Sequence, residues 1–106
     1  MSATSAAVWQ WSPEVITFAR AQGIDAYLEP LRQATCRLFP TARTLRIIKE
    51  DDPEIRDLSS ITYEVCVPYQ DVPDFVETHR RWVDELYKIC PAPRVCDFVL
   101  SLLLDE

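Results

Sequence analysis

The sequence predicts a single α+β domain, residues 1–106, with its elements in the order α-α-β-β-α-β. Three observations support this prediction. The length and the 48% content of hydrophobic residues suit one compact core. Residues 61–67 alternate between apolar and polar side chains, as a half-buried strand does. Residues 72–90 instead repeat apolar side chains at helical spacing.

A first short helix is expected at residues 12–22. Ser12 can cap its free amides, and Pro13 suits the first helical position. Gly23 can adopt the left-handed conformation that ends a helix. Residues 1–7 show no such pattern, so we expect them to be disordered.

A second short helix is expected at residues 30–39, after a turn at residues 24–29. Pro30 would open this helix and Pro40 would close it, because proline suits the first turn of a helix but cannot continue one. Neither helix is long enough to be stable alone, so both are expected to pack on the rest of the domain.

Two strands are expected in the middle of the chain. Residues 43–50 contain a short apolar run, and residues 61–67 give the clearest strand pattern of the sequence. The polar residues 51–57 between them exceed the usual length of a hairpin turn, so this connection should protrude.

A long helix and a final strand complete the prediction. Asp71 can cap a helix that continues to about Cys90, with Asp74 and Glu77 near its positive end. Residues 95–104 are apolar on both faces and are expected to form a strand, because the short connection suits a helix followed by a strand.

These elements predict a three-stranded mixed sheet. A hairpin followed by a right-handed crossover would place the long helix on one face of the sheet, and the two N-terminal helices would pack on the other face. The final strand would lie at an edge, and an apolar edge strand invites pairing with another chain. We therefore expect a homodimer formed through Phe98, Leu100 and Leu102.

Composition excludes several classes of function. With one glycine and eight prolines, the chain lacks the glycine-rich loops that bind nucleotide phosphates. No window approaches the roughly 18 apolar residues of a membrane span, and a net charge of −6 disfavours nucleic acid as a partner. The first residues lack a secretory signal, so we expect a cytoplasmic protein with reduced thiols. Neither a cofactor nor a metal site is expected, because the cysteines are not paired at ligand spacing.

Charge is unevenly distributed along the chain. Residues 1–49 carry six basic and three acidic groups, whereas residues 50–106 carry five basic and fourteen acidic groups. The basic side chains of residues 30–49 are expected to pair with carboxylates of the second half or of another subunit; the alternative is a surface for an anionic partner. The candidate interaction residues are Arg43, Arg46, Asp51, Asp52 and Glu54.

Trp9 and Trp11 precede the first helix. A hydrophobic residue just outside a helix cap commonly packs back on the helix, and we expect this role for one of them. The alternative is an exposed aromatic anchor for a protein partner.

His79 is the only histidine in the chain. At about 100° per residue it falls at the centre of the apolar stripe of the long helix, whereas Arg80 and Arg81 lie among carboxylates. The favoured interpretation is a core histidine with a hydrogen-bond partner. The alternative is a general base or ligand contact in a pocket with Trp82 and either Tyr63 or Tyr87.

Other reactive groups give weaker indications. Carboxylates at residues 50–54 could bind a hard cation, but they lack the spacing and the glycine of calcium loops, which favours a solvated loop. No motif identifies a nucleophile near the histidine. The nearest hydroxyls by sheet geometry are those of Ser59, Ser60 and Thr62. Cys90 and Cys96 could approach each other across a turn, although their spacing differs from that of redox pairs and favours buried thiols.

The leading hypothesis is a small non-enzymatic module that forms a homodimer and binds another protein. The alternative is a small-ligand-binding protein or an enzyme with a pocket around His79, Trp82 and Tyr63. Thiol chemistry at Cys90 and Cys96 is a third hypothesis.

Overall fold

The computed structural model describes residues 8–55, 59–91 and 97–105. Its elements are β1 (Val8–Trp11), α1 (Pro13–Gln22), α2 (Leu28–Leu38), β2 (Thr44–Asp51), β3 (Ser59–Pro68), α3 (Phe75–Ile89) and β4 (Phe98–Asp105). Short 3₁₀ helices at Asp25–Tyr27 and Tyr69–Asp71 precede α2 and α3. The α+β class and the order α-α-β-β-α-β are confirmed, and β1 is an additional strand at the N-terminal end.

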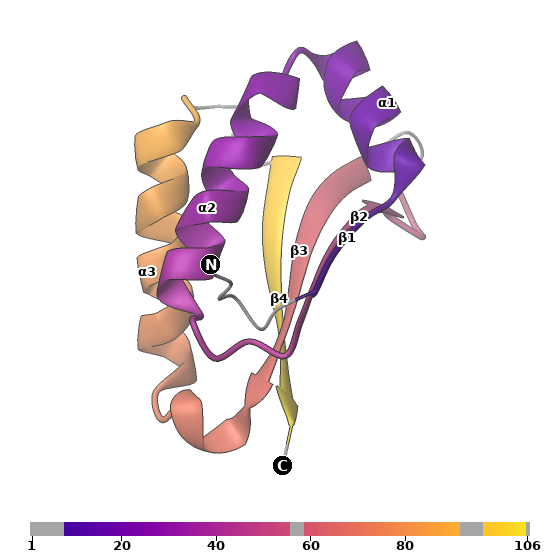
Figure 1. Ribbon diagram of the computed structural model, residues 1–106. Coiled ribbons are helices and arrows are strands. Elements are labelled where there is room, and N and C mark those ends of the chain that lie inside the picture. The colour runs from indigo at the N-terminus through magenta and orange to yellow at the C-terminus, as the bar shows by residue number, and fades with distance from the viewer. Residues whose placement is uncertain (1–7, 56–58, 92–96, 106) are drawn as a thin grey trace.

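The strands form one mixed sheet in the order β1-β2-β3-β4 (Figure 1). β2 and β3 are antiparallel, with Ile47 opposite Tyr63. β4 lies parallel to β3 at the edge of the sheet, with Leu100 opposite Tyr63. The expected hairpin, the connection through the long helix and the edge position of the last strand are therefore confirmed.

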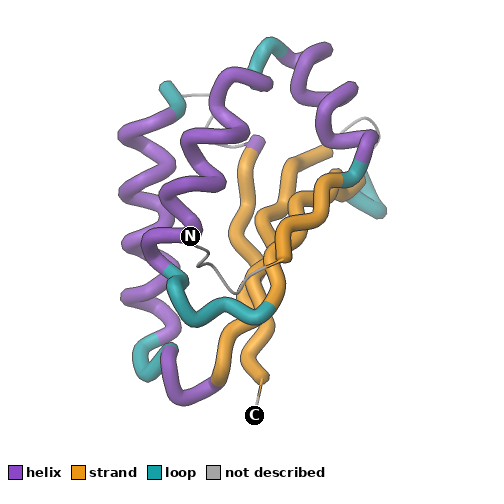
Figure 2. The backbone as a smooth tube through the Cα atoms, in the orientation of Figure 1, coloured by secondary structure: helices purple, strands orange, loops and turns teal. Residues whose placement is uncertain are grey.

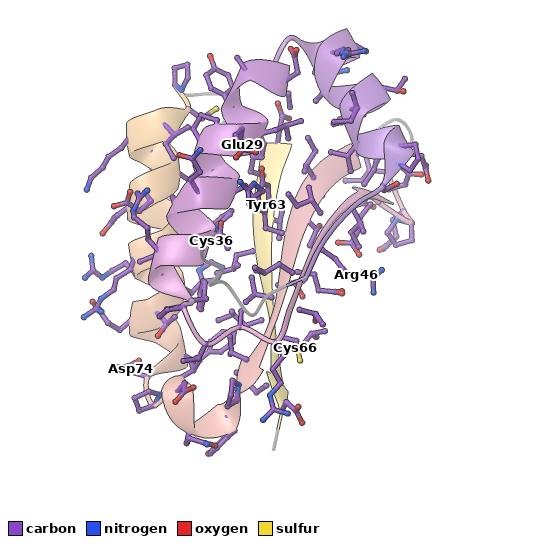
Figure 3. All side chains as sticks on the ribbon, viewed as in Figure 1. Glu29, Cys36, Arg46, Tyr63, Cys66 and Asp74 are labelled. Atoms are coloured by element: carbon purple, nitrogen blue, oxygen red, sulfur yellow. The ribbon has the colours of Figure 1, made fainter. Side chains whose placement is uncertain are left out.

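All three helices pack on one face of the sheet (Figures 1 and 2). The phenol of Tyr63 in β3 reaches the carbonyl of Leu28 in α2, and Lys49 in β2 lies over the ring of Phe18 in α1. The N-terminal helices were expected on the opposite face, and that expectation was wrong. The physical reason is that the opposite face of β2 and β3 is polar: Figure 3 shows Arg46 pointing away from the helices.

The first helix matches the sequence pattern closely. It begins at Pro13 and ends at Gly23, which adopts φ 73° in the left-handed region. The amide of Ile24 then donates to the carbonyl of Ala19 at 2.9 Å, as in a common helix C-terminal motif. Ser12 has extended backbone at the N-terminus, but its side chain makes no capping hydrogen bond.

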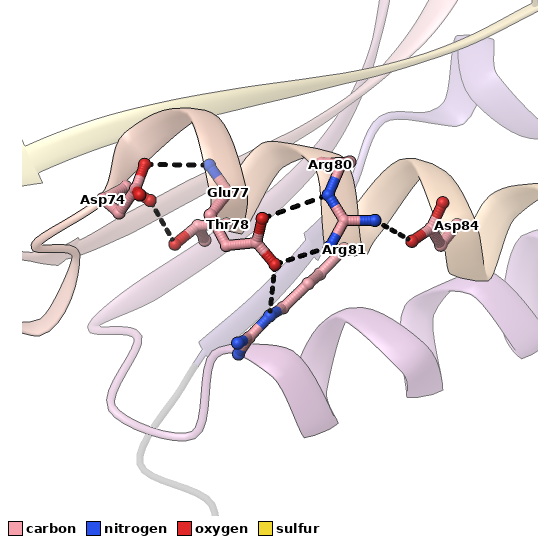
Figure 4. Close-up of polar contacts among 6 residues, drawn as sticks. All are labelled: Asp74, Glu77, Thr78, Arg80, Arg81 and Asp84. Carbon is pink, nitrogen blue, oxygen red and sulfur yellow. Dashed lines mark hydrogen bonds and ion pairs between the residues drawn. The ribbon is translucent and has the colours of Figure 1, made fainter.

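The other two helices begin at different residues from those expected. α2 begins two residues before Pro30, which lies in its first turn, where the missing amide proton has no intrahelical partner to lose. α3 is capped by Asp74 instead of Asp71: its carboxylate accepts a hydrogen bond from the amide of Glu77 at 3.0 Å (Figure 4).

The core lies between the helices and the sheet. Tyr63 and Trp82 are its largest fully buried side chains. Around them pack apolar residues from β2, β3 and β4, among them Leu45, Ile47, Ile61, Val65, Phe98 and Leu100. This core fixes the position of α3 beside β4, where the candidate site lies.

Candidate functional site

A groove runs between α3 and β4 along the outer edge of the sheet. Its volume is about 250 Å³, and it is lined by His79, Trp82, Val83, Leu86, Tyr87, Phe98, Val99 and Leu100. Most of these side chains are apolar, so the groove suits an apolar side chain or a small aromatic molecule.

His79 lies half-buried at the rim of this groove. Its ring stacks on that of Phe75, with the centroids 6.4 Å apart and the planes 18° apart. The buried face of α3 is centred on Trp82 and Leu86, which are 1% and 3% exposed. The sequence placed His79 at the centre of this face. It lies on the flank because the apolar stripe is wider than the part of the helix that α2 and the sheet cover.

Tyr63 lies behind Trp82 in the closed core. Their ring centroids are 6.0 Å apart, and the Tyr63 hydroxyl donates to the carbonyl of Leu28 at 2.8 Å. Burial raises the pKa of the Tyr63 phenol well above its usual range, so the phenol keeps its proton and this hydrogen bond. Of the predicted pocket residues, His79 and Trp82 line the groove, as does Tyr87, the alternative to Tyr63, whereas Tyr63 does not.

The candidate hydroxyl nucleophiles are engaged elsewhere. Thr62 donates to the carboxylate of Glu50, and strand alternation places it on the sheet face opposite Tyr63. Ser60 alternates with Thr62 and shares that face. The Ser59 hydroxyl donates to Asp51 at 2.6 Å. None of these three hydroxyls is therefore placed to form a dyad with His79.

Two carboxylates at the end of β2, those of Asp51 and Asp52, have partners within the chain. Asp51 accepts a hydrogen bond from Lys49 at 2.6 Å, which holds the pKa of that carboxyl below its usual range. Asp52 accepts from the amides of Glu54 and Ile55, both at 2.8 Å. Among the described residues, no three potential metal ligands come together.

The basic side chains of residues 30–49 all form ion pairs with carboxylates. The pairs are Arg32 with Glu29, Arg37 with Glu85, Arg43 with Asp105, Arg46 with Glu64 and Lys49 with Asp51. Four of the five acidic partners come from the second half of the chain, which confirms the expected pairing. The side chains of Arg43 and Arg46 remain 55% and 47% exposed, so these pairs contribute little to stability.

The arginines next to the histidine also pair locally. Glu77 accepts hydrogen bonds from Arg80 and Arg81, and Arg80 reaches Asp84 at 2.8 Å (Figure 4). The hydrogen bonds from Arg80 and then Arg81 hold the pKa of Glu77 below its usual range. These residues form a polar network on the solvent side of α3, separate from the groove.

The two tryptophans near the N-terminus belong to a strand that the sequence analysis missed. In β1, Trp9 lies opposite Leu45 and Trp11 lies opposite Ile47 in parallel register with β2. The signal was present, because a run of valine and tryptophan has high strand propensity. The sequence alone does not identify this strand, because a strand of only four residues requires a distant partner to form.

Three of the four cysteines lie in the described part of the chain. Cys90 is buried at the end of α3, and Cys36 and Cys66 are half-buried on different elements. Figure 3 places Cys36 on α2 and Cys66 on β3. Cys96 lies within residues 92–96, outside the described residues, so the predicted approach of Cys90 and Cys96 stays a prediction.

No helix among the described residues has the length and apolar character needed to cross a membrane.

No protein-family model matches the sequence, and no curated protein and no solved structure matches it significantly.

Proposed function

We propose that the protein is a non-enzymatic interaction module that forms a homodimer through the outer edge of β4. One observation carries this proposal. Among the described residues β4 pairs with a strand on one side only, and residues 98–104 contain neither a charge nor a proline. Edge strands usually carry such residues, which prevent pairing with another chain.

The exposed side chains of β4 support pairing through the edge of this strand. Val99, Leu103 and Leu104 are 41%, 46% and 37% exposed. Of the contacts that the sequence suggested, Phe98 and Leu100 are buried in the core, and Leu102 is partly buried against it. The contact would therefore use the backbone of β4 and its exposed residues, with the two copies antiparallel about a two-fold axis.

The same edge would also receive a strand from another protein. Addition of a strand to an open sheet edge is a common mode of peptide recognition, because backbone hydrogen bonds supply affinity and alternate side chains supply specificity. Binding of such a partner would compete with the homodimer.

A lysine on the edge strand tests the homodimer. The change Leu103→Lys would place a like charge from each copy near the two-fold axis, so the molar mass from sedimentation or light scattering should fall from two chains to one. Ile55→Lys is the matched control, because Ile55 is 56% exposed in the β2–β3 connection, away from β4. A wild-type protein that stays monomeric at high micromolar concentration would overturn the proposal.

A second candidate function is binding of a small apolar ligand in the groove between α3 and β4. The observation that favours it is the groove itself, about 250 Å³, with the imidazole of His79 and the indole ring of Trp82 on its walls. Pockets for small ligands begin at about 300 Å³, so the volume lies slightly below that range.

The fluorescent probe anilinonaphthalene sulfonate distinguishes the two candidates. If the groove is a ligand site, the probe should bind the wild-type protein, and His79→Ala should weaken that binding without changing the fold. If a second copy covers the groove, the probe should bind the Leu103→Lys monomer more strongly than the wild-type dimer.

A further inference from the structure

We infer that the dimer interface has a second layer, formed by one flank of α3 packing against the same flank of a second copy. This outer flank consists of Val76, His79, Val83 and Tyr87. The inference rests on the homodimer proposed above and specifies what lies over the paired β4 strands.

The outer flank lies on the side of α3 that faces away from α2. On the opposite flank of α3, Glu85 accepts a hydrogen bond from Arg37 of α2 at 3.2 Å. At about 100° per residue, Val83 and Tyr87 lie far around the helix from Glu85. Both residues line the groove beside β4. The outer flank therefore overhangs the open edge of the sheet.

This flank is apolar where a solvent-facing helix surface is normally polar. Val76 and Tyr87 are 76% and 60% exposed, and the flank residues follow one another at intervals of three, four and four positions. That spacing is typical of a helix seam that packs against another helix. The flank has no neighbouring helix among the described residues, because α2 lies on the other side of α3.

A second copy of this chain fits the flank because neither layer carries charge near the two-fold axis. Identical charges close to such an axis would repel their own copies. Val76, Val83 and Tyr87 of the outer flank carry no charge, and residues 98–104 contain no ionisable side chain. The adjacent Arg80 and Asp84 pair with each other at 2.8 Å and would lie at the rim.

The surface area that a stable dimer buries also favours a second layer. A stable dimer usually buries about 800 Å² on each partner, which a single strand edge of about 26 Å does not supply. At about 150–250 Å² for an aromatic side chain, the exposed parts of the apolar residues on both layers amount to on the order of 500 Å². They are Val76 and Tyr87 on α3 and Val99, Leu103 and Leu104 on β4. Half-buried His79 and Val83 and the backbone of β4 bring the contact toward the usual size.

Tyrosine substitutions test the helical layer separately from the strand. Tyr87→Glu should raise the dissociation constant of the dimer by about tenfold or more, because it places an acidic group at a helix contact. Tyr69→Glu is the matched control: Tyr69 is also 60% exposed, lies on the 3₁₀ helix between β3 and α3, and should change the constant by less than about twofold. Val76→Asp is a second flank variant, and its 76% exposure allows the monomer to fold normally.

The outcomes separate this inference from the proposed function. If Leu103→Lys abolishes the dimer while Tyr87→Glu and Val76→Asp associate as the wild type does, the strand edge acts alone and the helical layer is refuted. If the wild-type chain is monomeric, both proposals fail. Weakened association in both flank variants, with wild-type circular dichroism and an unchanged Tyr69→Glu control, supports the second layer.

Discussion

The indole of Trp82 donates a hydrogen bond to the hydroxyl of Thr35 at 3.0 Å, and this contact joins α3 to α2 across 47 positions of sequence. Thr35 in turn donates to the carbonyl of Leu31 at 2.7 Å, so its hydroxyl is both acceptor and donor. Trp82 is 1% exposed and Thr35 is fully buried. The contact therefore satisfies polar groups that have no access to water, and it fixes α3 against α2 beside the sheet.

Replacing Thr35 with valine should destabilise the protein by about 1–3 kcal/mol. The change keeps the shape of the side chain but leaves the buried indole N–H without an acceptor. Thr17→Val is the matched control, because the exposed Thr17 hydroxyl only bonds back to Pro13 within α1, and it should cost less than about 0.5 kcal/mol. Urea unfolding at one protein concentration measures both; equal losses would contradict the role of the contact.

Replacing Tyr63 with phenylalanine should cost about 1–2 kcal/mol at neutral pH, because the buried carbonyl of Leu28 loses its donor. The pH dependence has a definite sign. Burial raises the folded-state pKa of Tyr63, whereas the unfolded phenol titrates near 10. The folded state keeps a proton that the unfolded state loses, so this stabilisation is complete below about pH 10 and declines as the pH rises further.

The measurement for Tyr63 is urea unfolding of wild type and Tyr63→Phe at neutral and alkaline pH. The difference in unfolding free energy between the two proteins should narrow above about pH 10. Tyr69→Phe serves as a control at an exposed tyrosine. A difference that stays constant with pH would show that the phenol of Tyr63 ionises equally in both states.

Replacing Gly23 with alanine should cost about 1 kcal/mol, because Gly23 has φ +73° and a Cβ there would meet no atom within 4 Å. The cost is therefore conformational and not steric. Gly23→Asn should lose less, since asparagine tolerates the left-handed region. Thermal unfolding should show a fall of several degrees for alanine, about 4–8 °C for each kcal/mol in a small domain. An asparagine variant as unstable as the alanine variant would contradict this explanation.

Replacing His79 with alanine should cost less than about 1 kcal/mol, because the imidazole lies half-buried at an open groove. Trp82→Ala, in contrast, should cost about 3–5 kcal/mol. Both changes are best measured by urea unfolding in the Leu103→Lys background, where dimerisation does not add to the stability. A loss above about 2 kcal/mol for His79→Ala would restore the interpretation of a core histidine.

Local patterns predicted the elements well where the residues themselves impose the conformation. Pro13 and Gly23 mark the ends of α1 within one residue. The alternation in residues 61–67 lies within β3. The helix starts were less accurate: α2 begins before Pro30, and Asp74 caps α3 where Asp71 was expected. A proline or an aspartate suits more than one position near a helix start, and the connecting 3₁₀ helices decide which is used.

The candidate site, like the helix boundaries, could be predicted only in part from the sequence. The sequence identified the helix that carries His79 and Trp82, and it placed the last strand at an edge of the sheet. It did not separate Tyr63, which lies behind the indole in the core, from the residues of the groove. Helical phase predicts which residues share a face, but it cannot state how wide a part of that face the neighbouring elements cover.

The sequence by itself determined the α+β class, the order of the main elements and the pairing of the basic stretch with acidic residues. Hydrophobic periodicity and the positions of proline and glycine act on neighbouring residues, and the charge balance is a property of the whole chain. Only the tertiary structure decided that all three helices share one face, that β1 adds a strand, and that Val76 and Tyr87 remain exposed beside the open edge of β4. Those features depend on which surfaces meet, and contacts between distant segments carry no local signature in the chain.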